Sequence, residues 1–452
     1  LYLQDIPLTE ALERFHRALE EAGLWQVLGT EEIALDENAL GRVLAEPVWA
    51  RLSSPHYHAA AMDGFALKSE DTHGAMPTAP LLLAVGKQAA YVDTGDALPD
   101  WANAVVPVEQ VEALDENGGL CENIRRPYMI RIRAALSPWT HVRPMGEDIV
   151  ATQLVLPAGQ VLRPVDLGAL AACGQNTLKV SRPPRVAILP TGSELVPIGQ
   201  EVGKGDIIEY NSLVLASQVK AWGGQARRYA ITPDDFELIC QRVQQAADES
   251  DLVLLNAGSS AGSEDYSAPV VAQLGQLLVH GVAVRPGHPV ILGMLRRSEQ
   301  SARAGALVPV IGVPGYPASA ALTGEIFIEP LVARWLGRRA AEPPEVQAIL
   351  TRKVTSPAGD DDYLRVVVGK IRDRLLAAPL SRGAGVITSL VRADGIAILP
   401  RGVQGLEAGT HVRVRLYGRR SEMEKTICAI SSPDMTPVLL AALLAERDRR
   451  LV

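Results

Sequence analysis

The sequence has few aromatic residues and few cysteines. Aromatic residues make up 4% of its 452 positions, so Ala, Val, Leu and Ile must supply most of the buried surface. That composition favours layers of helix and sheet. The four cysteines are far apart in the chain and show no Cys-x-x-Cys spacing: Cys121, Cys173, Cys240 and Cys428. This pattern argues against a zinc site or a disulfide framework and fits a reducing cytosol.

The chain also lacks an excess of positive charge and any long hydrophobic run. Its net charge of −8 leaves no basic footprint for nucleic acid. No stretch approaches the roughly 18 apolar residues of a membrane helix. The first residues, LYLQDIPLTEAL, show neither the basic segment nor the apolar core of a signal peptide. We therefore expect a cytoplasmic protein with neither a nucleic acid nor a membrane as partner.

The composition that is present indicates a multidomain globular protein. Hydrophobic residues make up 47% and charged residues 21% of the chain, and a prior of roughly 150 residues per domain suggests about three domains. Changes in sequence pattern predict the following parts: a discontinuous N-terminal α+β domain (1–52 and 134–182), a β-rich insertion (53–133), an α/β domain (183–337), a small C-terminal β-barrel (345–420) and an extra tail (421–452).

The segment from Arg185 to about residue 335 alternates uninterrupted apolar runs with amphipathic helices. RVAILP, DLVLLN and VPVIGV are such runs, and PDDFELICQRVQQAA is such a helix. This rhythm predicts a mostly parallel sheet covered by helices on both faces, which is a three-layer α/β/α domain. Near the other end of the chain, Thr9 precedes an amphipathic run and predicts an N-capped helix.

Four loops that follow these apolar runs combine Gly with Pro or Ser. They are PTGSEL from Pro190, NAGSSAGSED from Asn256, VRPGHP from Val284 and VPGYPAS from Val313. Open α/β sheets bind ligands at the carboxyl ends of their strands, and glycine turns aim backbone N–H groups at anions. A turn that merely ends a strand explains any single loop about equally well. Four together favour a ligand with several oxyanion groups.

Two familiar phosphate-binding motifs are missing. No loop matches Gly-x-x-x-x-Gly-Lys-Ser/Thr, and no Gly-x-Gly-x-x-Gly follows a first strand, which argues against P-loop and dinucleotide sites. Acids instead follow the predicted strands: Glu194, Asp234, Asp235, Glu264 and Asp265. Carboxylates repel phosphate unless a cation stands between them, so we expect Mg²⁺. A helix N-cap is the alternative, more so for Asp234 than for Asp265.

The N-terminal half has one distinctive stretch, SSPHYHAAAMDGFAL, with Asp63 in a tight Met-Asp-Gly. His56 and His58 have no third metal ligand at suitable spacing, so the stretch predicts a loop of fixed shape rather than a metal site. A second cluster, VRPMGEDIV, places an arginine and two acids around a Gly turn. These charges either pair with one another or face a ligand.

Together these motifs resemble the molybdenum insertase family, which comprises the bacterial MoeA proteins and the E domain of gephyrin. The resemblance covers residues 5–418 and rests on seven segments in the family's order: AAMDGFAL, VDTGDALPDWANAVVPVEQV, VRPMGEDI, PTGSELV, SAGSEDY, VRPGHP and VPGYPASA. It implies a MogA-like central domain in an elongated four-domain subunit. It also implies a homodimer whose active site lies between the α/β domain of one subunit and the β insertion of its partner.

The resemblance further implies an activity. Family members take adenylylated molybdopterin and molybdate, insert the metal and release AMP with the help of Mg²⁺; an adenylyltransferase of the MogA type is an expected partner. By motif position, Asp63, Glu194, Asp234 and Asp265 would be catalytic, and Glu194 and Asp265 would bind the metal. The remaining positions would bind the substrate: Thr94, Asp148, Thr191, Gly192, Gly258, Ser260, Gly262, Arg285, His288, Pro314, Gly315 and Pro317.

Four positions depart from the family's motifs. Ala257 replaces a glycine, Arg285 and His288 replace two lysines, and Tyr316 replaces an asparagine. His288 and Tyr316 therefore keep open an alternative function, a protein that binds, stores or senses molybdopterin without inserting metal. A third possible function is that of an assembly scaffold, as in gephyrin. The tail resembles the start of a periplasmic-binding-like domain, although a plain C-terminal helix is an equal alternative.

Overall fold

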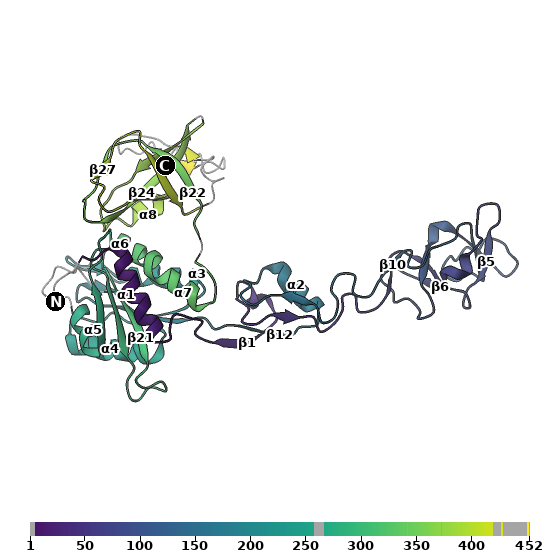
Figure 1. Ribbon diagram of the computed structural model, residues 1–452, viewed down its shortest axis with the longest axis horizontal. Coiled ribbons are helices and arrows are strands. Elements are labelled where there is room, and N and C mark those ends of the chain that lie inside the picture. The colour runs from purple at the N-terminus through teal and green to yellow at the C-terminus, as the bar shows by residue number, and fades with distance from the viewer. Residues whose placement is uncertain are drawn as a thin grey trace. The chain divides into compact units, whose positions relative to one another are not determined.

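The computed structural model describes residues 5–256, 266–340, 342–371 and 373–418, together with the backbone of residues 426–427 and 450–451. The chain forms two compact units (Figure 1). One comprises Thr30–Val180, and the other comprises Leu1–Gly29 with Ser181–Val452.

The Thr30–Val180 unit begins and ends with an α+β segment. Its short strands pair across the intervening insertion: β1 (Thr30–Ala34) with β12 (Thr177–Ser181), and β2 (Val48–Trp49) with β11 (Leu154–Leu156). Helix α2 (Pro164–Ala172) starts with proline in its first turn, and Asp166 accepts a hydrogen bond from the Arg163 N–H. Leu44, Leu162 and Leu170 pack together in the core of this segment.

The insertion within this unit is built from two three-stranded antiparallel sheets. The first has the order β6 (Ala89–Val92), β4 (Gly64–Leu67), β7 (Ala104–Pro107), and the second β5 (Leu81–Ala84), β9 (Met129–Ile132), β8 (Val111–Leu114). Two shorter strands, β3 (Ala59–Ala60) and β10 (Val142–Arg143), also pair. Phe65, Val106 and Ile130 meet in the shared core.

The other unit contains the α/β domain, whose six-stranded sheet has the order β16-β13-β17-β21-β20-β18. The first four strands run parallel, as the sequence predicts, and β20 runs antiparallel to both of its neighbours, β21 and β18. Strands β20 and β21 are joined by a short polar loop, which only antiparallel neighbours allow. The bounds are β16 (Gln225–Arg228), β13 (Arg185–Pro190), β17 (Leu252–Asn256), β21 (Leu307–Val313), β20 (Ile291–Arg296) and β18 (Gly275–His280).

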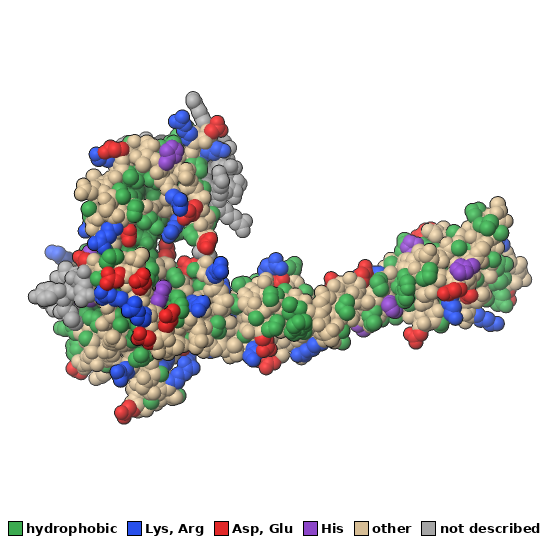
Figure 2. Space-filling model, viewed as in Figure 1, with side chains coloured by type: hydrophobic (Ala, Val, Ile, Leu, Met, Phe, Trp, Pro, Cys, Tyr) green, Lys and Arg blue, Asp and Glu red, His purple; other side chains and the backbone are tan. Residues whose placement is uncertain are grey.

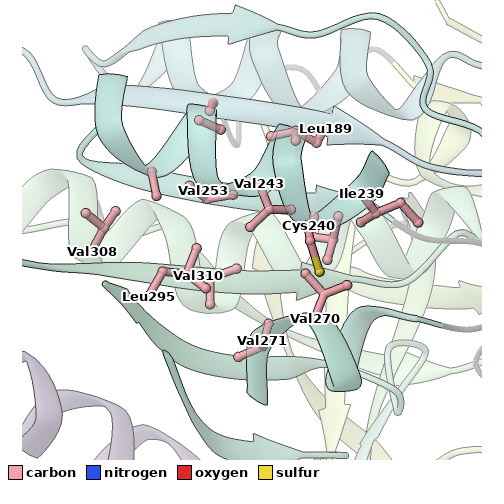
Figure 3. Packing of buried hydrophobic residues seen from close by; sticks show 14 of the residues in the cluster. Leu189, Ile239, Cys240, Val243, Val253, Val270, Val271, Leu295, Val308 and Val310 are labelled. Atoms are coloured by element: carbon pink, nitrogen blue, oxygen red, sulfur yellow. The ribbon is translucent and has the colours of Figure 1, made fainter. Parts of the chain in front are cut away.

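Helices cover both faces of this sheet. On one face, α4 (Phe236–Glu249) and α5 (Ser267–Leu274) contact each other and the central strands. Val243 and Val270 of these helices point toward Val253 and Val310 of the strands, all four fully buried (Figure 3). The helices α3 (Asn211–Ala221) and α6 (Pro317–Thr323) contact each other and the sheet; α6 continues into the π-helix η4 (Gly324–Ile328) and α7 (Glu329–Trp335).

Helix α1 (Leu8–Glu21) contacts β18 and β20. It begins one residue before the predicted cap: Pro7 is the N-cap, so the prediction for Thr9 was wrong. Proline fixes the backbone angle required there and lacks an N–H group that would need a partner.

The C-terminal domain is a closed barrel of β24, β25, β22, β28 and β26, in which β26 pairs back onto β24. Alternating buried valines and leucines fill its interior. A two-residue strand from the α/β domain, β19 (Val284–Arg285), pairs with the start of β24. The barrel bounds are β22 (Glu345–Leu350), β24 (Asp361–Ile371), β25 (Arg374–Pro379), α8 (Thr388–Arg392), β26 (Gly395–Leu399) and β28 (His411–Leu416).

These observations confirm the predicted fold class, a three-layer central domain with a β-rich insertion, an N-terminal α+β segment and a small barrel. Of the tail, only the backbones of β29 (Thr426–Ile427) and β30 (Arg450–Leu451) are described, so the periplasmic-binding-like prediction lies outside the described residues. Acidic and basic side chains are interspersed on the face shown in Figure 2. Among the described helices, none has the length and hydrophobicity to cross a membrane.

Candidate functional site

Three of the four predicted loops line two adjoining cavities in the unit that contains the α/β domain. The smaller cavity, of about 450 Å³, is bordered by the loop after β13 and by the loop after β21. The larger, of about 1120 Å³, is bordered by the Arg285–Pro289 segment, by the loop after β21 and by the barrel. Gly315 and Tyr316 line both cavities. The carboxyl ends of neighbouring parallel strands bring these loops to one edge of the sheet.

The smaller cavity contains one acid with a free carboxylate, Glu194. Within the described residues, no donor bonds to its side chain, which is half-buried. The loop beneath it is fixed by the backbone, because Thr191 N donates to Asn256 O (2.9 Å) and Gly192 N donates to Thr232 O (3.0 Å). Gly192 has φ +153°, and a Cβ there would lie 2.8 Å from Glu194 Oε2. Glycine therefore allows the carboxylate to fold over the loop.

Asp234, predicted as a catalytic acid, holds this loop from the side. Its Oδ2 accepts a hydrogen bond from Ser193 N (2.8 Å), and its own N–H donates to Ser193 Oγ (3.0 Å). The N-cap of α4 is its neighbour Asp235, which accepts from Leu238 N (2.8 Å). The alternative of Asp234 as N-cap was therefore wrong, because the helix starts one residue later.

A second acid in the smaller cavity, Glu209, is already engaged. It accepts hydrogen bonds from the backbone N (2.7 Å) and Oγ (2.5 Å) of Ser212, and Arg228 lies 3.6 Å away. Glu209 thus satisfies one free N–H group in the first turn of α3, whose N-cap residue is Tyr210. Among the described residues no group of three His, Cys, Asp or Glu side chains is placed to share a metal ion. Mg²⁺ usually keeps several waters and needs one or two carboxylates, so Glu194 fits such an ion as a single protein ligand.

The loop after β21 is held by two asparagines that the sequence analysis missed. Asn256 Nδ2 donates to the carbonyls of Val313 and Pro314 (both 3.2 Å), and Asn211 Nδ2 donates to Gly315 O (2.6 Å). The signal for Asn256 is a lone polar residue at the end of the apolar run DLVLLN; it is only 4% exposed. These bonds fix the backbone between the two cavities.

The larger cavity is lined by three arginines, and two of them are paired with carboxylates. Arg285 Nε donates to Asp360 Oδ2 (2.5 Å), and Arg382 bonds to Asp362. His288, the other predicted residue here, bonds through Nε2 to Asp5. Arg285 and His288 thus line the cavity, but each already has an acidic partner.

Arg365 is the third arginine, and the sequence analysis missed it. It is 3% exposed, donates from Nη2 to Ser381 O (2.9 Å), and its Nε is buried without a partner. No described carboxylate pairs with it, and burial lowers the pKa of its guanidinium, which still stays charged. The signal was a lone arginine in the apolar strand YLRVVVG. Such a cation suits an oxyanion.

The remaining predicted residues lie elsewhere. Asp63 and Thr94 meet in the insertion, where Asp63 Oδ1 accepts from Thr94 N and Oγ1 (2.7 Å each), and these bonds lower the pKa of Asp63. Asp148, in the same unit, is exposed, and its N–H donates to Ser54 O (3.0 Å). Four predicted residues lie outside the described residues: Gly258, Ser260, Gly262 and Asp265.

Chemically, this unit offers an arginine-lined cavity for an oxyanion. Beside it lies a smaller cavity whose single free carboxylate, among the described residues, suits an anion bridged by a cation.

Three family models match the chain: "MoeA N-terminal region (domain I and II)" over residues 6–174, "Probable molybdopterin binding domain" over 187–334, and "MoeA C-terminal region (domain IV)" over 347–417.

Relatives match over most of their length. A molybdopterin biosynthesis protein of Methanocaldococcus jannaschii is 33% identical over 394 residues (84% of this chain, 90% of that protein). Molybdopterin molybdenumtransferase 2 of Mycobacterium tuberculosis is 31% identical over 403 residues (83% and 92%).

Solved structures agree. A molybdopterin biosynthesis MoeA protein from Pyrococcus horikoshii aligns with a TM-score of 0.73 at 31% identity, covering 92% of this chain and 100% of that one. The matched domains follow one another in the family's order along almost the whole chain. This chain therefore belongs to the MoeA family.

Proposed function

We propose that this chain is a molybdopterin molybdenumtransferase, which inserts molybdenum from molybdate into adenylylated molybdopterin and releases AMP in molybdenum cofactor biosynthesis. In the net reaction the dithiolene sulfurs replace oxygen ligands of molybdate, which leave as water, and water adds across the phosphoanhydride, which frees AMP and leaves the other phosphate on molybdopterin. The observation that carries the proposal is the pair of adjoining cavities, one with Arg365 and one with Glu194, neither of which pairs with an opposite charge among the described residues. Relatives named molybdopterin molybdenumtransferase support it.

In this proposal the larger cavity receives molybdate. Arg365 supplies a fixed cation with a donor that has no other partner, and Arg285 adds a second guanidinium at the cavity wall. Both are preorganised, since Asp360 orients one and Ser381 O the other. Charged donors held in place in advance stabilise a dianion without reorganising when it binds.

The smaller cavity receives the phosphoanhydride, with Mg²⁺ as its counter-ion. Bound Mg²⁺ would neutralise phosphate charge and polarise the bond that breaks. Glu194 would hold the ion, and the Thr191–Gly192 turn would set the distance between this carboxylate and the sheet edge. Asp234 would position the turn through Ser193.

Three further elements belong to the proposal. The exposed pair Asp63 and Thr94, with Asp148, would complete the site from the second subunit of a homodimer, as the resemblance to the family implies. A MogA-like adenylyltransferase would deliver the substrate. The described cysteines are free thiols, which suits work in the cytoplasm.

The test is a turnover assay with adenylylated molybdopterin, molybdate and Mg²⁺. We expect AMP to be released in a molybdate-dependent manner together with a metal-containing cofactor that reconstitutes a molybdoenzyme apoprotein. Tight binding of molybdopterin without AMP release would instead support the storage or sensing alternative. Absence of both binding and release would refute the assignment.

A further inference from the structure

Tyr316 lines both cavities. Tyr316 is 57% exposed, although its neighbours Pro314 and Pro317 are buried. An aromatic ring left this open to water gains free energy when a flat apolar surface covers it. The ring is thus a candidate contact for a ligand that extends from one cavity into the other.

The backbone that carries this ring is fixed on each side. Asn211 Nδ2 donates to Gly315 O (2.6 Å), Ala320 N donates to Tyr316 O (2.8 Å), and Ala318 N donates to Ala384 O of the barrel (3.0 Å). A rigid support lowers the entropy lost when the side chain contacts a ligand. Tyr316 therefore resembles an aromatic anchor more than a mobile surface side chain.

The barrel covers one part of the ring. A Cβ built at Gly385 would lie 3.6 Å from Cδ1 of Tyr316, so the glycine backbone packs close to the ring. Gly385 lines the smaller cavity and Ala384 the larger. The ring is supported by the 384–385 backbone, and its remaining surface borders the two cavities.

The charged groups of the two cavities indicate which part of the substrate lies next to Tyr316. If molybdate lies by Arg365 and the phosphoanhydride by Glu194, the pyran ring that carries both the dithiolene and the phosphate arm lies between them, beside Tyr316, and the fused pterin rings extend from it. We propose that Tyr316 is a specificity-determining residue that packs its ring against this pterin system. The inference rests on the proposed function and deepens it, because it assigns a substrate contact to a residue that departs from the family's asparagine.

The experiment compares Tyr316→Phe, Tyr316→Leu and Tyr316→Asn with the wild type in equilibrium binding of molybdopterin and, separately, of molybdate. Loss of stacking on the aromatic ring should weaken the binding of molybdopterin to the Leu and Asn variants by about 5- to 150-fold. Phe keeps the ring and should bind within about twofold of the wild type. Molybdate affinity should be unchanged in all three, with thermal unfolding confirming that each is folded.

Each outcome decides the matter. If the wild type binds molybdopterin but Tyr316→Asn binds it equally well or more tightly, the ring is an obstacle and the inference fails while the proposed function stands. If Phe loses as much as Asn, the hydroxyl is the contact and ring packing is refuted. If the wild type binds neither molybdopterin nor its adenylylated form, the proposed function fails, and this inference with it.

Discussion

The two cavities that adjoin at Tyr316 differ in the sign of the charged group that has no oppositely charged partner among the described residues: Arg365 in the larger cavity and Glu194 in the smaller one. In the larger one, Arg285 and Arg382 are each paired with a carboxylate before any ligand arrives. In the smaller one, the carboxylate of Glu194 has no cation beside it within the described part of the chain. A paired charge must partly exchange its partner to bind a ligand, whereas an unpaired charge gains one.

This contrast indicates where ligand affinity resides. The paired arginines shape the larger cavity, but a new anion competes with Asp360 and Asp362 for them. No described carboxylate competes for Arg365, which is buried and lines the cavity. One unpaired group of each sign, Arg365 and Glu194, should therefore dominate binding in its own cavity.

The largest effect should come from removing Arg365. Hydrogen bonds to charged groups contribute about 1.5–3 kcal/mol each, so Arg365→Met should weaken molybdate binding about 100-fold. Arg365→Lys keeps the charge but loses the fork and should fall in between. Isothermal titration with molybdate measures this, with Arg413→Met on the exposed outer barrel surface as control. A loss below threefold would show that the paired arginines carry the site.

The next largest effect concerns the smaller cavity. Glu194→Gln removes the charge and keeps the shape, so Mg²⁺-dependent AMP release should drop by about 10- to 100-fold, and higher Mg²⁺ should partly restore it. Molybdate affinity should not change, because Arg365 lies in the other cavity. The matched control is Glu201→Gln, an exposed acid without a partner, which should behave as wild type. Equal rates for both variants would remove Glu194 from the proposed cation site.

The loops of this site and Arg285 follow from the sequence, whereas Arg365 and Arg382 do not. Apolar runs that end in Gly-Pro or Gly-Ser turns place PTGSEL and VPGYPAS at one sheet edge, because parallel strands share their carboxyl ends. Arg365 reaches the cavity only because β19 pairs with β24 across about 75 residues of chain, an arrangement that no local pattern encodes. Its sequence signal, one arginine among valines, marks a buried charge without saying where it points.

The sequence also predicts where the acids of the site lie but not which of them form hydrogen bonds with the protein. Position after a strand predicts that Glu194 and Asp234 lie near one loop, and both do. It does not distinguish the acid that stays free from those that form hydrogen bonds with the protein, as Asp234 and Glu209 do. That distinction depends on single donors, such as the N–H groups of Ser193 and Ser212, whose placement requires the folded backbone.

Glu325 is another acid that has no cation partner among the described residues, and it extends the comparison to stability. Burial raises the pKa of Glu325 in η4 to about 7, against the opposing effect of a hydrogen bond from Tyr417. An acid whose folded pKa lies above its unfolded value favours folding only while protonated, so stability falls as pH rises from about 4.5 through 7. Glu325→Gln should therefore raise stability by about 1–3 kcal/mol at pH 8 and little at pH 4.5.

Thermal unfolding at the two pH values measures this difference. The control is Glu299→Gln on an exposed loop, which should shift neither value. A Tm gain for Glu325→Gln that is equal at both pH values would mean that packing, and not ionisation, distinguishes the two side chains. A loss at pH 8 would show that the ionised carboxylate is stabilised in the folded protein, which the burial of Glu325 without a cation opposes.

The smallest effect should come from Asp234, whose Oδ2 accepts from Ser193 N. Asn offers the same acceptor, so Asp234→Asn should release AMP within about twofold of wild type, whereas Asp234→Leu loses a bond of about 1 kcal/mol and should be about fivefold slower. A metal ligand would behave differently, since it needs its charge. If AMP release by Asp234→Asn falls as far as that by Glu194→Gln, both carboxylates take part in the reaction. The contrast with the paired arginines would then involve two acids instead of one.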